Sequence, residues 1–278
     1  MLQRIFGFLT ALAVFVGGMA FVGVPVLERR LTFLPVAADP ARPWTPPAGA
    51  QDVFFDSAPG ITLHGWYWRA DPAKPAPITI LYSHGNADNV VPFAPEAARL
   101  AAAGFDVLLF DYRGYGRSAG SSDDESTLFS DGRAAMDYLV RQRGVPPQSI
   151  AHYGYSLGSV LAAELSVTYP CRAVVLLAPL ASMSIHVSLL FPWLPEALRG
   201  LARNRFDTVG KIARANCPVM VIHGDRDEVI DVAQGRAVWA AAREPKRLVI
   251  IPGGPHWLGS AGNTHIDAAT AFIRSPHS

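Results

Sequence analysis

One pentapeptide constrains the fold of this chain more than any other feature of its sequence. Gly154-x-Ser156-x-Gly158 follows residues 149–153, whose apolar pattern predicts a short buried strand, and it precedes a segment that predicts a helix. A serine in this pattern lies at a sharp turn, and the glycines are needed because strand and helix approach too closely for larger side chains. The turn would expose the hydroxyl beside the free N–H groups of the helix N-terminus, which suits acyl transfer. Ser156 is therefore the candidate nucleophile.

Apolar runs and helical segments alternate on both sides of this turn. Two aromatic-rich runs joined through Pro59-Gly60 predict an antiparallel hairpin, and buried strands and helices follow in turn. The expected strands are 52–57, 61–68, 78–82, 105–110, 149–153, 173–177, 219–223 and 246–251, and the expected helices include 92–103, 126–143, 156–168 and 264–273. This alternation predicts one α/β domain with a mostly parallel, eight-stranded sheet, helices on both faces, and a site at the carboxyl ends of the strands.

One stretch, residues 179–214, interrupts the alternation. It contains no strand pattern, and it concentrates large apolar residues around Pro192 and Pro195. We expect a short helical cap over the sheet. Its apolar side chains could belong to the core or line a pocket for an apolar substrate, and both interpretations stay open. These residues are Ile185, Val187, Leu189, Leu190, Phe191, Trp193, Leu194, Leu198 and Leu201.

A nucleophilic serine needs a histidine that takes its proton and a carboxylate that orients the histidine. In this architecture the acid follows the serine in the chain, and the histidine follows the acid. Asp225 and Asp227 come directly after the strand 219–223, and His256 comes after the last strand in a glycine-containing loop. Both loops fall at the carboxyl edge of the sheet. We therefore expect His256 to reach Ser156, with one of the two aspartates as the acid.

Four motifs together resemble those of the α/β-hydrolase-domain serine hydrolases. They are His84-Gly85-Asn86, Phe110-Asp111-Tyr112-Arg113-Gly114-Tyr115-Gly116-Arg117-Ser118, Gly154-Tyr155-Ser156-Leu157-Gly158 and His223-Gly224-Asp225-Arg226-Asp227-Glu228-Val229-Ile230. The resemblance extends from about Leu31 to the C-terminus. It is strongest to the branch of membrane-anchored esterases that includes protein depalmitoylases.

The resemblance assigns further roles. In that family the acid is the aspartate three residues after the glycine of the His-Gly turn, which here is Asp227. The oxyanion hole is formed by two backbone N–H groups, which here belong to Asn86 and Leu157. Trp257-Leu258 stands where family members often carry a small polar pair. We expect these two large apolar groups to lie beside the histidine and help to bury an acyl chain.

The motifs therefore predict a serine hydrolase that cleaves carboxylic esters or thioesters through an acyl-enzyme. A serine peptidase on the same fold is one alternative, because the same triad would serve it. A non-catalytic scaffold is another, although such a protein should have lost at least one triad member. Clusters of Cys and His at zinc spacing and a Gly-rich phosphate loop are absent from the sequence, so we expect no metal and no cofactor.

The N-terminus carries a run of 23 residues without a charge, residues 5–27. It is long enough to span a bilayer, so we expect residues 1–30 to form a single-pass membrane anchor with the catalytic domain outside the cytoplasm. The alternative is a signal peptide that is cleaved after Ala20 and releases a secreted enzyme. Residues 31–50 contain five prolines and predict an extended linker, which leaves residues 51–278 as the catalytic domain.

Charge and cysteine content add two expectations. The net charge is +1 and there is no run of Lys or Arg, so nucleic acid is not an expected partner. Cys171 and Cys217 each precede an expected strand, and a disulfide could form if these strands are neighbours. We expect two buried free thiols instead, because free cysteines are among the most buried residues.

Overall fold

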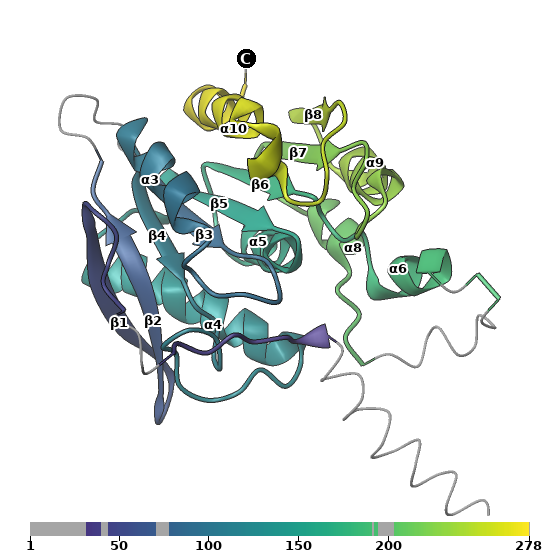
Figure 1. Cartoon of the computed structure of the whole chain (residues 1–278). Helices are drawn as coiled ribbons and strands as arrows, with labels where there is room; N and C mark the ends of the chain where they lie inside the picture. The colour runs from purple at the N-terminus through teal and green to yellow at the C-terminus, as the bar shows by residue number, and fades with distance from the viewer. Residues whose placement is uncertain (1–31, 40–43, 71–77, 191, 194–202, 278) are drawn as a thin grey trace, which may run out of the picture.

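A computed structural model describes residues 32–39, 44–70, 78–190, 192–193 and 203–277. Within these residues, eight strands form one sheet in the order β1-β2-β4-β3-β5-β6-β7-β8 (Figure 1). The strands are β1 (Ala50–Ala58), β2 (Ile61–Trp68), β3 (Thr79–Ser83), β4 (Asp106–Phe110), β5 (Ile150–Tyr155), β6 (Ala173–Leu177), β7 (Val219–Gly224) and β8 (Lys246–Ile251). The pairs β1·β2 and β2·β4 are antiparallel and the other five pairs are parallel. The predicted α/β fold with its mostly parallel eight-stranded sheet is confirmed.

Helices cover both faces of the sheet, as expected from the alternation. The helices are α3 (Ala94–Ala102), α4 (Glu125–Asp137), α5 (Leu157–Thr168), α6 (Met183–Leu190), α8 (Thr208–Ile212), α9 (Val232–Ala241) and α10 (Thr264–Arg274). Alternate residues of β3 divide the core: Tyr82 packs in the cluster that holds residues of α3 and α10, whereas Leu81 packs in the cluster that holds residues of α4 and α5 (Figure 1). The sheet is therefore buried on both sides, which explains the nearly continuous apolar runs of its central strands.

The segment expected to form a cap lies partly outside the described residues, which omit residues 191 and 194–202. Its described part contains the helices α6 and α8. The Met183 N–H at the start of α6 donates a hydrogen bond to the Arg205 carbonyl at 2.8 Å. Ile185 and Leu189 on α6 remain 37% and 48% exposed. These two side chains therefore do not belong to the core.

Residues 32–38, which the sequence suggested were part of a linker, lie against the catalytic domain. Phe33 is 4% exposed and packs edge-on against Phe206, with 6.1 Å between ring centroids. The Ala38 N–H donates to the Gly116 carbonyl at 2.7 Å, and the Gly116 N–H donates to the Val36 carbonyl at 2.9 Å. Hydrogen bonds and a buried aromatic ring therefore fix this stretch to the domain.

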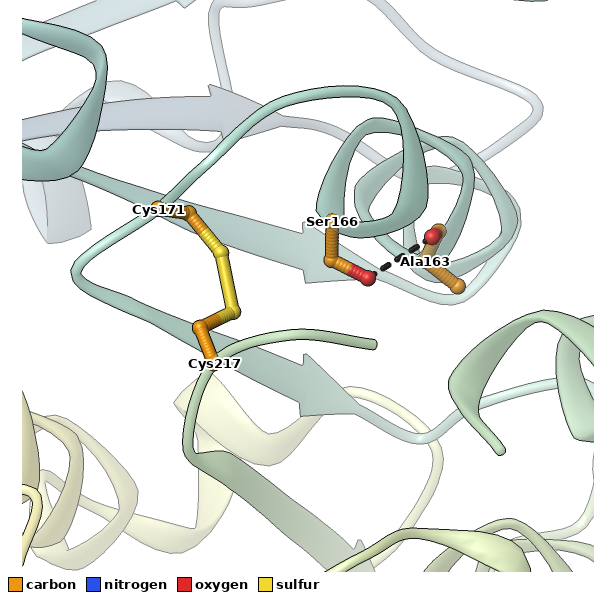
Figure 2. Close-up of a disulfide and its surroundings, with 4 residues drawn as sticks. All are labelled: Ala163, Ser166, Cys171 and Cys217. Carbon is orange, nitrogen blue, oxygen red and sulfur yellow. Dashed lines mark hydrogen bonds between the residues drawn. A yellow bond between two sulfur atoms is a disulfide. The ribbon is translucent and has the colours of Figure 1, made fainter. Parts of the chain in front are cut away.

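The two cysteines form a disulfide, so the expectation of two free thiols is wrong. Cys171 precedes β6 and Cys217 precedes β7, and these parallel strands are neighbours in the sheet. The Cα atoms of the two cysteines are 5.9 Å apart, a separation that a disulfide spans without backbone movement. Figure 2 shows the bond between the two chain segments. In the same view, the Ser166 hydroxyl of α5 donates to the Ala163 carbonyl at 2.8 Å.

No helix in the described part of the chain is long and apolar enough to cross a membrane. The expected anchor, residues 1–30, lies outside the described residues.

Candidate active site

The turn that carries Ser156 has the geometry that its two glycines predict. Ser156 lies between β5 and α5 with φ of +51°, in the left-handed region that is costly for a residue other than glycine. A Cβ atom on Gly154 would lie 2.3 Å from the Gly158 carbonyl oxygen, and one on Gly158 would lie 2.0 Å from the Ser83 carbonyl oxygen. Both contacts are too short for any side chain. The close approach of helix to strand therefore requires the glycines and presents the serine.

The structure brings Ser156, His256 and Asp227 together. The Ser156 hydroxyl lies 3.2 Å from His256 Nε2, and His256 Nδ1 lies 2.8 Å from Asp227 Oδ2. The Asp227 carboxylate is buried, whereas the His256 side chain is 17% exposed. With Nδ1–H donating to the carboxylate, Nε2 carries a lone pair that can accept the serine proton.

Asp227 is held in its ionised form by the loop around it. Its Oδ1 accepts hydrogen bonds from the Val229 and Ile230 N–H groups at 2.9 and 2.7 Å. Burial raises the pKa of Asp227, but hydrogen bonds from two histidines and from the backbone outweigh burial and hold that pKa well below its ordinary value. The second histidine is His223, whose Nε2 lies 3.0 Å from Asp227 Oδ2 and 2.8 Å from the Ile230 carbonyl. The sequence places His223 in the turn before the acid, and its contact with Asp227 was not predicted.

Hydrogen bonds hold the backbone of His256 at both its N–H and its carbonyl, which the sequence did not predict. Its N–H donates to Glu228 Oε2 at 3.1 Å, and its carbonyl accepts a hydrogen bond from the Tyr155 hydroxyl. The Tyr155 ring also meets the His256 ring edge-on, with 5.7 Å between centroids. Tyr155 is the second residue of the pentapeptide and Glu228 follows the acid, so both residues belong to motifs that the sequence reveals. Their partners lie 101 and 28 residues away, beyond any local pattern.

Of the two expected oxyanion donors, Leu157 follows the serine directly, and Asn86 follows Gly85, at which a Cβ atom would lie 3.6 Å from Ser156 Cβ. Leu157 is the first residue of α5, so its N–H has no partner within that helix. Asn86 lies in the loop after β3. Its side chain makes three hydrogen bonds that the sequence did not predict: Nδ2–H donates to the Thr32 carbonyl at 2.6 Å, and Oδ1 accepts from the Leu34 N–H at 3.0 Å and from the Tyr115 hydroxyl at 2.8 Å. The N-terminal stretch is thereby tied to the candidate oxyanion loop.

Two other polar candidates make contacts outside the Ser156, His256 and Asp227 series. Asp225, the alternative acid, accepts a hydrogen bond from the Gly253 N–H at 2.6 Å, and the contact to the histidine is made by Asp227. His84 stacks on Tyr112 with 4.4 Å between ring centroids, and its Nδ1 lies 2.7 Å from the Gly85 carbonyl. His84 therefore occupies a hydrogen-bonded position in the turn after β3.

The Trp257-Leu258 pair does not lie as expected. Leu258 is fully buried and belongs to the core between the sheet and α10, because a short 3-10 helix begins there and turns its side chain inward. Trp257 remains partly exposed and packs against Phe93 and Tyr155, with ring centroids 5.1 and 5.4 Å away. Of these two residues, only Trp257 is available to contact a substrate.

Helix α6 lies close to the candidate triad. Its His186 has a pKa lowered by burial, and the charges of Asp227 and His256 act on that pKa in opposite directions. His186 Nδ1 also lies 3.2 Å from Gln234 Nε2 on α9. The described part of the expected cap therefore borders the site.

This arrangement suits nucleophilic acyl transfer. A buried carboxylate, a histidine and a serine form one chain of hydrogen bonds, and helix N–H groups lie beside the serine. Among the described residues, no group of three or more His, Cys, Asp or Glu side chains could hold a metal ion.

Comparisons with known proteins identify similar chains. The family model described as serine aminopeptidase, S33, matches residues 74–210, which include Ser156. The Mycobacterium tuberculosis protein Rv2307c is 37% identical over 230 residues, which cover 82% of this chain and 80% of that protein. The mouse alpha/beta hydrolase domain-containing protein 17C is 33% identical over 226 residues, which cover 81% of this chain and 66% of that protein. Among solved structures, the Pyrococcus furiosus esterase Pf2001 is similar with a TM-score of 0.68 at 18% identity, over 87% of this chain and 97% of the esterase chain.

Proposed function

The chain belongs to the α/β-hydrolase family, and from that premise we propose that it is a serine hydrolase of carboxylic esters or thioesters. The observation that carries the proposal is the hydrogen-bonded series from Ser156 through His256 to Asp227, at 3.2 and 2.8 Å. A serine at a strained turn, a histidine in reach and a buried ionised acid are the parts that acyl transfer requires.

In the proposed reaction, Ser156 Oγ attacks the acyl carbon while His256 Nε2 takes the hydroxyl proton. Asp227 keeps the histidine in the tautomer whose Nε2 is free, and it stabilises the imidazolium that forms. The backbone N–H groups of Asn86 and Leu157 would bind the oxyanion. The alcohol or thiol then leaves with the proton from His256, and water cleaves the acyl-enzyme by the same steps.

A serine peptidase is the alternative, and the description of the matching family model favours its consideration. An aminopeptidase must bind the ammonium group of its substrate, for which a carboxylate near the serine is the natural partner. The carboxylates of the acid loop are engaged elsewhere: Asp227 with His256, Glu228 with the His256 N–H, and Asp225 with the Gly253 N–H. We therefore favour esters. Aminoacyl p-nitroanilides and p-nitrophenyl esters, assayed side by side, separate the two activities, and faster turnover of the anilides would contradict the ester proposal.

We further propose that residues 5–27 anchor the protein in a membrane with the catalytic domain outside the cytoplasm. The length and lack of charge of this run support an anchor. The disulfide between Cys171 and Cys217 supports an oxidising compartment. The contacts of residues 32–38 favour a catalytic domain that starts by residue 32 rather than at residue 51. Full-length protein should stay in the membrane pellet after alkaline carbonate washing. A mature N-terminus at Phe21 would establish a cleaved signal peptide instead.

Acyl chain length is the sharpest test of the substrate class. Burying a methylene group is worth about 0.8 kcal/mol, so if half of that reaches the transition state, each added methylene raises kcat/KM about twofold until the pocket is full. The measurement is kcat/KM for p-nitrophenyl esters from acetate to palmitate, with Ser156→Ala as the blank for uncatalysed turnover. A maximum at acetate followed by a steady fall would leave a small-ester hydrolase.

A further inference from the structure

Large apolar side chains that are exposed gather around the candidate active site. In the described part of the chain, six of them lie on segments that border the site: Leu34, Val36, Val91, Ile185, Leu189 and Val229. Trp193, three residues beyond α6, is 76% exposed, and Phe54 lies apart from the group on the edge strand β1. Single exposed apolar residues are ordinary on any protein surface, but their concentration around one site is not.

Three of the six residues border the candidate oxyanion loop. The Leu34 N–H donates to the Asn86 side chain at 3.0 Å. Asn89, three residues further along the same loop, joins Val36 and Val91: its Nδ2–H donates to the Val36 carbonyl at 3.2 Å, and its Oδ1 accepts from the Val91 N–H at 3.0 Å. These bonds therefore join the N-terminal stretch to the oxyanion loop at the positions that carry the three exposed side chains.

The other three residues border the acid and the histidine. Val229 is two residues beyond Asp227, and its N–H donates to that carboxylate at 2.9 Å. Ile185 and Leu189 are one helical turn apart on α6, so they share a face of that helix. His186, between them in the sequence, lies close enough to the triad for its charges to act on the His186 pKa. We call the six residues together the apolar rim.

The path of the chain identifies what covers the apolar rim. The described chain starts at Thr32, whose carbonyl is bonded to Asn86 on this same face. The uncharged run of the proposed anchor ends at Leu27, only five residues earlier. Five residues span at most about 18 Å when fully extended. If the run is anchored in a bilayer, the face that carries Thr32 is held next to the membrane surface.

We propose that the apolar rim docks on the surface of the lipid bilayer that holds the anchor, so that the serine takes acyl chains directly from the membrane. This inference rests on the proposed anchor and deepens the proposed function. A bilayer accepts apolar side chains from several separate segments without a fitted counterpart, which suits a rim built from three loops and a helix. A protein partner or a second copy of the chain would cover the same residues, and the test separates them.

The first experiment locates the apolar rim relative to the bilayer and does not depend on catalytic activity. The two native cysteines are joined in the disulfide, so a newly introduced cysteine is the thiol that reacts with an environment-sensitive fluorophore. Full-length Leu189→Cys and Phe54→Cys proteins are labelled and reconstituted in vesicles of phosphatidylcholine and phosphatidylglycerol. Phe54 is a matched control for Leu189, because the two side chains are 47% and 48% exposed.

The Leu189→Cys label should shift to shorter emission wavelength and be quenched by brominated lipids, whereas the Phe54→Cys label should do neither. Equal, water-like emission at both positions would overturn the proposal. A shift at Leu189 that brominated lipids do not quench and that grows with protein concentration would instead indicate a second copy of the chain.

The second experiment reads the consequence for turnover. The full-length double variant Val36→Ser/Leu189→Ser should hydrolyse a long-chain ester embedded in vesicles at least about 10-fold more slowly than wild type, while hydrolysis of soluble p-nitrophenyl acetate changes less than about twofold. Phe54→Ser should leave both rates unchanged. An equal loss on both substrates, or no loss on either, contradicts docking. If wild type hydrolyses neither ester, the proposed function fails, and the fluorescence result still decides the docking surface.

Discussion

The side-chain oxygen of Asn86 accepts a hydrogen bond from the Leu34 N–H at 3.0 Å, across 52 positions of sequence. The same side chain donates a hydrogen bond to the Thr32 carbonyl, and it accepts another from the Tyr115 hydroxyl. Asn86 thus fixes the loop whose backbone N–H we assign to the oxyanion hole, and it does so through the stretch that follows the proposed anchor. The position of the proposed donor then depends on residues that an alignment of catalytic motifs would leave out.

Replacing this side chain should lower the rate more than the affinity. Asn86→Ala keeps the backbone N–H but removes the three hydrogen bonds that orient it, so we expect kcat to fall about 10-fold with KM little changed. The exposed Asn263, at the start of α10, makes no side-chain cap and offers Asn263→Ala as the matched control. Unchanged kcat in Asn86→Ala would show that the loop holds its position without these three hydrogen bonds.

The two aspartates of the acid loop should differ strongly in their effect on catalysis. Asp227→Asn retains an oxygen for the Val229 and Ile230 N–H groups, but it favours the wrong histidine tautomer and should lower kcat by about 10³- to 10⁴-fold. Asp225→Asn should cost far less, because within the described part of the chain that carboxylate accepts the Gly253 N–H and does not contact His256. Steady-state kinetics with p-nitrophenyl butyrate compare the two. The opposite ranking would mean that the acid has been assigned to the wrong residue.

His152 should make the folded state sensitive to acid. It lies on β5 between Leu81 of β3 and Val174 of β6, and neither ring nitrogen has a hydrogen-bond partner among the described residues. Burial lowers the pKa of His152 to about 3, below its ordinary value of 6.5. Between these values the unfolded chain binds one more proton than the folded one, so stability falls as pH falls, by about 1.4 kcal/mol per pH unit.

His152→Leu removes this titration and the unpaired ring. Between pH 7 and pH 5, wild type should lose about 2 kcal/mol more of its unfolding free energy than His152→Leu. Urea unfolding at both pH values measures the difference, with the exposed His277→Leu as the control. The same loss in wild type and His152→Leu would mean that His152 does not titrate in this range.

The disulfide should stabilise the folded chain. It closes a loop between residues 46 positions apart, and such a bond typically contributes about 2 to 4 kcal/mol. Reduction should therefore lower the urea midpoint of wild type and leave that of a Cys171→Ser/Cys217→Ser variant unchanged. Iodoacetamide labelling of both cysteines in unreduced, denatured protein would show that the bond is absent.

The fold could be predicted because its signals are local. Apolar runs marked the strands, and the glycines at positions 154 and 158 indicated an approach between strand and helix that the 2.3 and 2.0 Å contacts bear out. The order of Ser156, an aspartate and His256 along the chain placed three side chains at one edge of a parallel sheet, where the structure brings them together.

What could not be predicted depends on which segments become neighbours. Whether Cys171 meets Cys217 is decided by the adjacency of β6 and β7, which no local pattern encodes. Trp257 and Leu258 look alike in sequence, yet the start of a 3-10 helix buries only the second. Asn86 contacts Tyr115, 29 positions away, and it also contacts Leu34 and Thr32, 52 and 54 positions away, in a stretch whose prolines suggested a free linker.

The central claim is that Ser156 is the nucleophile of an acyl transfer, and labelling with a fluorophosphonate tests it most directly. Wild type should be labelled at Ser156, as peptide mass spectrometry would show, and Ser156→Ala should lose both the label and about 10⁴-fold or more of kcat, with its urea unfolding curve little changed. Ser159→Ala, one turn along and with its hydroxyl bonded to the Ser156 carbonyl, should keep the label. Undiminished labelling of a folded Ser156→Ala protein would contradict the account.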